Sequence, residues 1–416
     1  MFFPSVFRHR AFAVMWLARL TTNIATLMQS VAIGWLVYTL SRQTHDERES
    51  MFFVGMIGLA QFLPMFALTL FAGETADRYN RRKIILICTL MQAFCAAAFT
   101  ALALQPHVSM TLIFLVAGLF GVVRAFNAPA SASIIPTLVP RKDLSKAIAW
   151  HTLTHQTGMV IGPWLGGALC AIAPAHANAV SCALYLLASI ATFILLKMPL
   201  PTRQKTKEDI SRLALIREGL VHLWRSKVVL GAISLDLFAV LLGGVTALLP
   251  AYAKDILDIG PQGFGHLRAA FAVGAGLTTL GLALWPIKRH AGKWMLGGVT
   301  VYGLATLGFA VSRNVGLSML ALAIAGSADS FSVFMRQNLV QIITPDAMRG
   351  RVSAVSSLFV SASNELGEFE SGLAARFFGV IGSAVFGGLG SIAITVLWAK
   401  IFPSLRKADH LTPIDS

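Results

Sequence analysis

The residues best suited to chemistry in this sequence are ionisable side chains that stand inside long apolar stretches. In the first half these are Arg19 and Arg124, and no acid accompanies them. The second half holds a larger set of both signs, which comprises Asp236, Arg268, Asp329, Arg336, Glu365, Glu368, Glu370 and Arg376. Burying a charge is costly unless it is paired, so each of these residues is a candidate for a functional role.

Polar side chains accompany Arg19 on one helical face. Arg19, Asn23 and Thr26 recur at intervals of three or four residues, so a helix presents them as one stripe. Such a face suits the wall of a path for an anionic or aromatic amphipathic solute. His151 and His155 have a spacing that can bind zinc, but no cysteine or acid is near them in sequence. We therefore predict a wall or interface role for them and no metal site.

The composition places the chain in a membrane. Of its 416 residues, 56% are hydrophobic and only 13% are charged, and the mean hydropathy is +0.70. A soluble chain carries about 25% charged residues. The net charge of +15 would suggest nucleic acid in a soluble protein, but it is typical of the cytoplasmic loops of a membrane protein. We therefore predict no nucleic-acid partner.

Twelve stretches reach the length of about 20 residues that a membrane span needs. They cover residues 11–40, 51–73, 84–104, 108–135, 144–173, 177–197, 228–253, 264–286, 294–312, 315–342, 353–378 and 381–402. With Lys146, Lys197 and Lys400 at the span ends included, the termini and the connections on their side hold 25 of the 34 lysines and arginines, and the opposite connections hold four. The excess of positive charge on the cytoplasmic side predicts that both termini are cytoplasmic.

The longest connection divides the twelve stretches into two sets of six. It opens with prolines, continues polar, and turns amphipathic between Leu213 and Leu223. We predict an N-terminal six-helix bundle over 1–197, a cytoplasmic linker with a surface helix over 198–227, and a C-terminal six-helix bundle over 228–416.

The two halves resemble each other. A shift of 205 residues superposes three pairs, which are Pro140 with Pro345, Gly162 with Gly367, and Gly167 with Gly372. Repeated halves with a site between them are typical of secondary transporters. The predicted fold class is an all-α membrane protein with twelve transmembrane helices in two pseudo-symmetric bundles.

The stretch GETADRYNRRK connects the second and third spans. Its distinctive residues are Gly73, Asp77, Arg78, Arg81 and Arg82. It resembles the signature of the major facilitator superfamily, which implies a cytoplasmic gate at this loop. A carboxylate can rest on the positive end of a helix, and basic residues can bind carboxylates or lipid phosphates. Asn80 stands where the superfamily usually has glycine, and asparagine tolerates a left-handed backbone.

A second stretch, GMVIGPWLGG in the fifth span, places helix-weakening residues inside the membrane. It contains Gly158, Gly162, Pro163, Gly166 and Gly167. Glycines at this spacing let another helix approach closely, and the proline bends the helix. The pattern resembles the motif of the superfamily's proton-coupled antiporters, although ordinary small-residue packing is an alternative. The wider stretches PASASIIPTLVPRKDLSKA and NELGEFESG are similar to the drug and siderophore efflux branch and its enterobactin-exporter-like group.

The resemblance implies that spans 1, 4, 7 and 10 line a central path. Arg124 overlies Asp329 under the shift, and Arg19 and Asp236 each lie about eight residues into their spans. We predict switchable pairs between Arg19 and Asp236 and between Arg124 and Asp329, with Arg336 in the same cavity. An acid beside an arginine stays ionised and takes up a proton when its partner leaves. The alternative is a static pair that holds the halves together.

Glu365 and Glu368 form a second candidate for proton coupling. They lie about 60° apart on a helix, and two such close carboxylates do not both ionise in a low dielectric. The alternative is that they are struts between the halves, receiving basic residues such as Arg78 and Arg376.

These observations predict a secondary active transporter in the bacterial inner membrane. We expect a proton-coupled exporter of a small amphipathic or anionic solute, siderophore-like or drug-like, with protons and membrane lipid as further partners. We expect a monomer with no cofactor and no metal. An uptake permease or a lipid transporter of the same fold is the alternative. An enzyme is disfavoured because the sequence contains no Gly-x-Ser-x-Gly, HExxH or nucleotide-binding motif.

Overall fold

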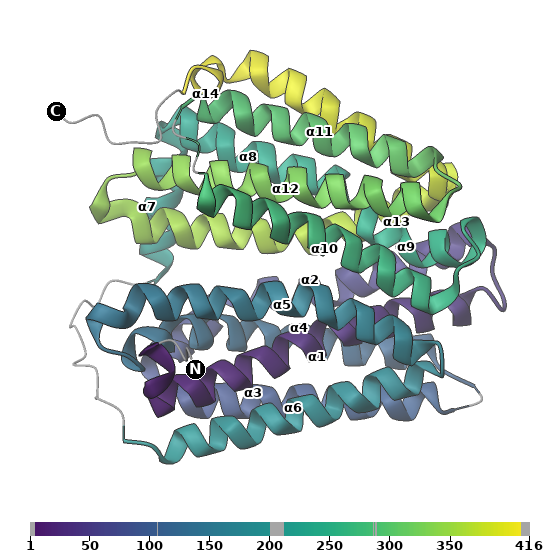
Figure 1. The fold of residues 1–416 in the computed structure, drawn as a ribbon, viewed down its shortest axis with the longest axis horizontal. Coiled ribbons are helices and arrows are strands. Elements are labelled where there is room, and N and C mark those ends of the chain that lie inside the picture. Colours follow the sequence, from purple (N-terminus) through teal and green to yellow (C-terminus); the bar gives the residue numbers. More distant parts are fainter. Residues whose placement is uncertain (1–4, 106, 200–211, 286, 288, 409–416) are drawn as a thin grey trace. The chain divides into compact units, whose positions relative to one another are not determined.

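A computed structural model describes residues 5–105, 107–199, 212–285, 287 and 289–408 (Figure 1). These residues form helices joined by short connections, and no β-strand element occurs among them. Ten of the described helical segments are long and apolar enough to cross a membrane. The all-α class predicted from composition is therefore confirmed.

The first half of the chain contains six long helices and three short 3-10 turns. Their bounds are η1 (Ser5–Arg8), α1 (Arg10–Ser41), α2 (Glu47–Arg78), α3 (Arg81–Ala103), α4 (Met110–Ile134), η2 (Ile135–Thr137), η3 (Arg141–Asp143), α5 (Leu144–Cys170) and α6 (Pro174–Lys197). Among them α3 packs on α4 and α6, and α5 packs on α6.

The second half begins with an amphipathic helix and continues with the remaining spans. Its elements are α7 (Arg212–Arg225), α8 (Lys227–Leu242), α9 (Val245–Ala251), the π-helical turn η4 (Tyr252–Ile256), α10 (Gly260–Leu284), α11 (Ala291–Val311), α12 (Val315–Ile343), α13 (Asp346–Ile401) and α14 (Pro403–Arg406). Here α11 packs on α12 and α13, and α13 packs on α8.

The twelve predicted spans correspond to these helices with two adjustments. The helix α13 covers the last two spans, and its backbone leaves the helical region at Gly379, where φ is 75° and ψ is 169°. Gly379 lies between the predicted stretches 353–378 and 381–402. The fifth span is α5, a helix of 27 residues that is not among the ten apolar segments. With α13 counted as two, the described helices give the twelve-span fold.

The seventh span is broken, whereas the sequence predicted one continuous stretch over 228–253. The helix α8 ends before Gly243 and Gly244, and α9 begins directly after them. A Cβ on Gly243 would lie 2.6 Å from a ring carbon of Tyr302, and one on Gly244 would lie 2.5 Å from the Gly367 carbonyl oxygen. Glycine is required at both positions because α11 and α13 come closer than a side chain allows.

The structure divides into two compact units that nearly follow the two halves. The division falls within the predicted linker, but residues 41–59 belong with the second unit and residues 260–265 with the first. The beginnings of α2 and α10 therefore pack on helices of the opposite half. The units differ from the predicted bundles 1–197 and 228–416 in these two segments.

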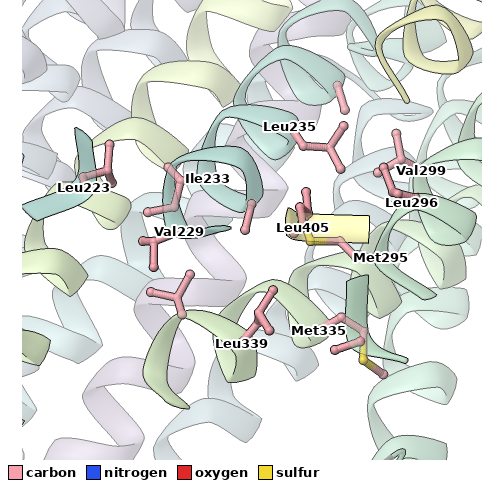
Figure 2. Packing of buried hydrophobic residues seen from close by; sticks show 14 of the residues in the cluster. Leu223, Val229, Ile233, Leu235, Met295, Leu296, Val299, Met335, Leu339 and Leu405 are labelled. Atoms are coloured by element: carbon pink, nitrogen blue, oxygen red, sulfur yellow. The ribbon is translucent and has the colours of Figure 1, made fainter. Parts of the chain in front are cut away.

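The core of the second unit is aliphatic and gathers side chains from seven of the described helices. Figure 2 shows Val229 and Ile233 of α8 facing Met295 of α11 and Leu339 of α12. Leu223 of α7 joins the same cluster and is 3% exposed. The amphipathic linker helix is therefore held against the unit by its apolar face.

The linker helix is also fixed by polar and backbone contacts to α13. Glu218 forms an ion pair with Arg351, and a Cβ on Gly219 would lie 2.9 Å from the Arg351 carbonyl oxygen. The side chain of Leu213 lies outside the described residues. The predicted surface helix thus exists, with Leu223 as its buried anchor.

Candidate functional site

A buried ion pair joins α8 and α12 in the second unit. The Asp236 carboxylate Oδ1 lies 3.3 Å from Nε of Arg336, and the two side chains are 6% and 3% exposed. Arg336 also donates from Nη1 to the Ser356 hydroxyl of α13 at 3.0 Å. Three helices of one unit therefore converge on a single guanidinium.

A second carboxylate belongs to the same cluster. The charges of Asp236 and Arg336 both act on Asp329, which stands two turns before Arg336 on α12. Asp329 itself makes no hydrogen bond or ion pair with another described residue. The cluster thus holds two carboxylates and one guanidinium, and it carries one negative charge in excess unless a cation neutralises it.

Tyr302 of α11 connects this cluster to the broken span. Its hydroxyl donates to the carbonyl oxygen of Gly243, and the Asp329 charge acts on its ring. The sequence reasoning did not select Tyr302 or Ser356. No signal in the sequence marks them, because their importance comes from where α11 and α13 pass the acids.

The first unit presents its own cation on α1. Nε of Arg19 is buried, and Arg19 makes no hydrogen bond or ion pair with another described residue. Its charge acts on His151 and His155 of α5. Asn23, one turn further along α1, donates to the Thr154 hydroxyl at 3.0 Å.

The rest of the predicted polar stripe takes part in a buried network. Thr26 shares a hydrogen bond of 3.0 Å with the Tyr185 hydroxyl of α6, and Tyr185 donates to Gln29 at 3.1 Å. Tyr185 is fully buried and Gln29 is 1% exposed. Asn23 and Thr26 therefore tie α1 to α5 and α6, and any role they have along a solute path stays a prediction.

Arg124 meets a neutral partner in the first unit. It donates from Nη1 to the Gln61 side-chain oxygen at 3.0 Å. The predicted partners of Arg19 and Arg124 are Asp236 and Asp329, which belong to the other unit. Those two pairings stay predictions. Asp236 pairs with Arg336 of its own unit, a residue that the sequence had placed only in the same cavity.

The glycines of α5 admit α1, as their spacing predicted. A Cβ on Gly158 would lie 3.0 Å from Cβ of Asn23, and one on Gly162 would lie 2.8 Å from Cβ of Leu27. Gly166 meets the backbone of the same helix one turn later. The helix continues through Pro163, which is buried. The packing role of the motif is present, and its role in antiport stays a prediction.

The last glycine of the motif contacts a different helix. A Cβ on Gly167 would lie 2.8 Å from Cα of Gly265, at the start of α10. Its repeat counterpart Gly372 behaves in the same way, since a Cβ there would lie 2.8 Å from Cα of Gly55 on α2. We call these two contacts the glycine seams. Each joins a span of one half to a span of the other, and the two seams occupy corresponding places in the repeat.

The inner glycine pair of the repeat has matching contacts as well. Gly162 packs on α1, and Gly367 packs on α8, where a Cβ would lie 2.7 Å from the Val240 carbonyl oxygen. The first and seventh spans are themselves counterparts. The alignment of glycines by a shift of 205 residues is thus matched by equivalent helix contacts.

The signature loop binds helix ends within the first unit. Arg81 donates to the Ser133 carbonyl oxygen at 2.9 Å and lies 3.5 Å from the Asp77 carboxylate. Arg82 donates to three carbonyl oxygens at the end of α6, the shortest of them 2.7 Å away at Met198. Positive groups at a helix C-terminus are favourable because of the helix dipole. The predicted gate between bundles stays a prediction.

Two members of the loop have local roles. Arg78 pairs with Glu74 on the same helix at 2.5 Å, with both side chains largely exposed. Asn80 has an extended backbone, with φ of −67° and ψ of 112°, and its side chain accepts from the Arg82 amide at 3.0 Å. Asn80 is the N-cap of α3, so this position does not use the left-handed backbone that asparagine tolerates. The buried Gly73 lies in the last turns of α2.

The acids of α13 stand beside a glycine seam. A Cβ on Gly58 would lie 2.7 Å from the Glu365 carbonyl oxygen and 3.0 Å from Cβ of Glu368. Glu368 lies 4.0 Å from the Arg268 guanidinium of α10. Arg376, one of the partners expected if these acids are struts, instead lies 3.9 Å from Glu49. The Glu368 side chain therefore meets α2 and α10 within one unit, and Glu365 meets α2 through its backbone.

The described helices define a class of protein, a multi-pass membrane protein of the twelve-helix fold. Solved structures show the same fold. A bacterial homologue of the human lysosomal transporter Spinster has a TM-score of 0.69 at 17% identity, over 96% of both chains. A D-xylose–proton symporter has a TM-score of 0.71 at 14% identity, over 95% of this chain and 98% of that one.

The family is shown by the sequence. The family described as transmembrane secretion effectors matches residues 3–415, and the chain belongs to this branch of the major facilitator superfamily. The enterobactin exporter EntS of Salmonella typhi is 27% identical over 98% of this chain and 95% of its own length. The protein of the same name from Escherichia coli O81 is 28% identical over 97% and 95%.

Proposed function

We propose that this protein is a proton-coupled exporter in which the Asp236–Arg336–Asp329 cluster carries the proton. The observation that supports this proposal is the excess of one carboxylate over guanidinium in a cluster where Asp236 and Arg336 are buried and Asp329 is half-buried. An ionised carboxylate without a partner is expensive to hold away from water. A proton is the smallest cation that neutralises it.

The two aspartates have different parts in this mechanism. Asp236 lies against Arg336 and stays ionised through that pair. Asp329 has no ion-pair partner among the described residues, and it takes up the proton. When the cluster opens to the other side of the membrane, access to water lets Asp329 release it. The exchange of proton for solute then follows from alternating access of one site to the two sides.

The names of the relatives suggest the direction and the solute. The matching family is described as secretion effectors, and the curated relatives are named enterobactin exporters. We propose export of a small amphipathic or anionic solute of the siderophore type, with enterobactin as the first compound to test. At 27% identity the relatives are distant, so a different compound of this class is compatible with the same mechanism.

The membrane setting follows from the charge of the connections. We propose that the chain lies in the bacterial inner membrane as a monomer with both termini in the cytoplasm, because the basic residues gather on that side. A fluorescent protein that folds only in the cytoplasm, fused to the C-terminus, is expected to be bright. A dark fusion with full expression would contradict this orientation.

Transport in everted inner-membrane vesicles tests the mechanism. With an acidic interior, wild-type protein is expected to accumulate enterobactin, and Asp329→Asn is expected to reduce the gradient-driven rate at least about tenfold. Asp258→Asn is the matched control, because Asp258 is exposed in a connection and asparagine tolerates its positive φ of 51°. This control is expected to transport like wild type.

Three results would count against the proposal. Wild-type rates in Asp329→Asn would show that this carboxylate does not carry the proton. Accumulation that persists after a protonophore collapses the gradient would favour an uncoupled or lipid-moving protein. A wild-type protein that moves no enterobactin, while a proton gradient still drives export of other anions, would overturn the solute alone.

A further inference from the structure

Two hydrogen bonds between α1 and α5 bracket one short segment of each helix. Trp16 donates from Nε1 to the Trp150 carbonyl oxygen at 3.0 Å, and Asn23 donates to the Thr154 hydroxyl at 3.0 Å. Arg19 lies between the two donors on α1. The two donors lie about two turns apart on α1, and the two acceptors lie about one turn apart on α5. The segment between the two bonds is therefore a rigid frame around Arg19.

Arg19 has no counter-charge in this frame. Its Nε is buried without a hydrogen bond, and Arg19 forms no ion pair with any other described residue. The helices α1, α3, α4, α5 and α6 contain no aspartate or glutamate. A guanidinium presents five donors in a planar fork that matches an anionic oxygen pair. The chain supplies the donors here, and no nearby helix of this unit supplies the anion.

Two histidines and an aromatic cluster adjoin this frame in the sequence. His151 lies on α5 between Trp150 and Thr154, and the Arg19 charge acts on it. A neutral imidazole has one donor and one acceptor nitrogen, so it can complete the contacts of a bound oxygen. At the end of the frame that Trp16 and Trp150 form, these two rings lie 6.2 Å apart, and Phe7 packs on both. An apolar wall thus closes one end of the segment that holds Arg19.

We propose that Arg19 and His151 form the binding site for the anionic group of the exported solute, with the Trp16–Trp150 wall against its apolar body. The ligand class is an organic anion whose charge is on oxygen, a carboxylate or an ionised phenol. The proposal rests on the proposed function because an exporter must hold its solute. It assigns solute binding to the first unit and proton binding to the cluster of the second. The two functions therefore belong to different residues of the chain.

Equilibrium binding to purified protein tests this site without a proton gradient. The probes are 2-naphthoate and the uncharged 2-naphthamide, and the measurement is isothermal titration calorimetry in lipid nanodiscs. Wild type is expected to bind the naphthoate at least about tenfold more tightly than the naphthamide. Arg19→Gln is expected to weaken naphthoate binding about 10- to 100-fold, since a hydrogen bond to a charged group is lost, and to leave naphthamide binding unchanged.

The matched control removes a positive charge from α5 outside this frame. Lys146 is exposed on α5, about one turn before His151, and Lys146→Gln is expected to bind naphthoate like wild type. His151→Ala is expected to weaken naphthoate binding about three- to tenfold, because it removes one neutral hydrogen bond. Arg19→Lys keeps the charge without the fork and is expected to fall between wild type and Arg19→Gln.

Equal naphthoate affinity in wild type and Arg19→Gln would overturn the site. Equal affinity of wild type for the naphthoate and the naphthamide would overturn it as well. If Arg19→Gln does not fold, wild-type affinity in both Arg19→Lys and His151→Ala would overturn the site in its place. Because no gradient is present, failure here leaves the proton role of Asp329 standing, and failure of Asp329→Asn in transport leaves this binding result standing.

Discussion

Replacing Arg336 by glutamine isolates the cost of the buried pair. The change removes the cation 3.3 Å from Asp236 and leaves that carboxylate 6% exposed without a partner. Breaking a buried ion pair from one side costs about 3–5 kcal/mol of stability. Both side chains are buried, so solvent screening does not reduce this figure much. Arg336→Gln is therefore expected to lower the free energy of unfolding by an amount in this range.

The double variant separates the pair from the two single sites. In D236N/R336Q both groups of the pair are neutral, and Asp329, the remaining acid of the cluster, is expected to be protonated, so no charge is stranded. Its free energy of unfolding is expected to lie within about 1 kcal/mol of wild type. The resulting coupling energy of about 2 kcal/mol or more is the part of the stability that belongs to the pair.

The assay is unfolding of purified protein by SDS in mixed micelles, followed by far-ultraviolet circular dichroism. Glu74→Gln is the control, because it breaks the pair of Glu74 with Arg78, whose side chains are 48% and 72% exposed. An exposed pair contributes about 0–1 kcal/mol after screening. The reasoning fails if Arg336→Gln costs no more stability than Glu74→Gln. It also fails if the loss in D236N/R336Q equals the sum of the losses in Asp236→Asn and Arg336→Gln.

Three further predictions use the same unfolding measurement. Gly167→Ala is expected to cost about 1–3 kcal/mol, because the added methyl would meet the backbone of α10. Gly276→Ala on α10 has open space around it and is expected to cost nothing or to stabilise by up to about 1 kcal/mol, so equal losses would contradict the seam. Gly379→Ala is expected to cost about 1–2 kcal/mol because of the positive φ, and Gly308→Ala, in open space on α11, is its control. A Gly379→Ala protein as stable as this control would refute the strained break. Asn80→Ser is expected to be within a few tenths of a kcal/mol of wild type and Asn80→Ala to lose about 0.5–2 kcal/mol, since serine also caps a helix. Equal losses in the two Asn80 variants would show that the cap is unimportant.

The spans and their pairing in two halves could be predicted because they depend on composition along the chain. Apolar length locates a membrane helix, and glycines separated by 205 residues reveal the repeat. The break at Gly243 and Gly244 could not be predicted in this way. Glycine pairs are common in membrane helices, and the close approach of Tyr302 and Gly367 to this pair comes from segments far away in the sequence.

The charged residues of the candidate site were found, but their partners were assigned by symmetry. The repeat suggested that Arg124 faces Asp329 and that Arg19 faces Asp236. The described partner of Asp236 is Arg336, on a helix of the same unit. Helical spacing cannot show which neighbour a side chain reaches, since that depends on how α8 and α12 rotate about their axes. The symmetric pairs stay predictions because their members belong to different units.

Contact of backbone on backbone limits how this chain can diverge. At Gly167 with Gly265, and at Gly55 with Gly372, neither partner has a side chain to exchange for another. A substitution on one side therefore has no reciprocal substitution that restores the fit. Gly167 and Gly372, which correspond in the repeat, are both held to glycine in this way. The charged residues inside the spans are under no such backbone constraint, and the two halves differ in them.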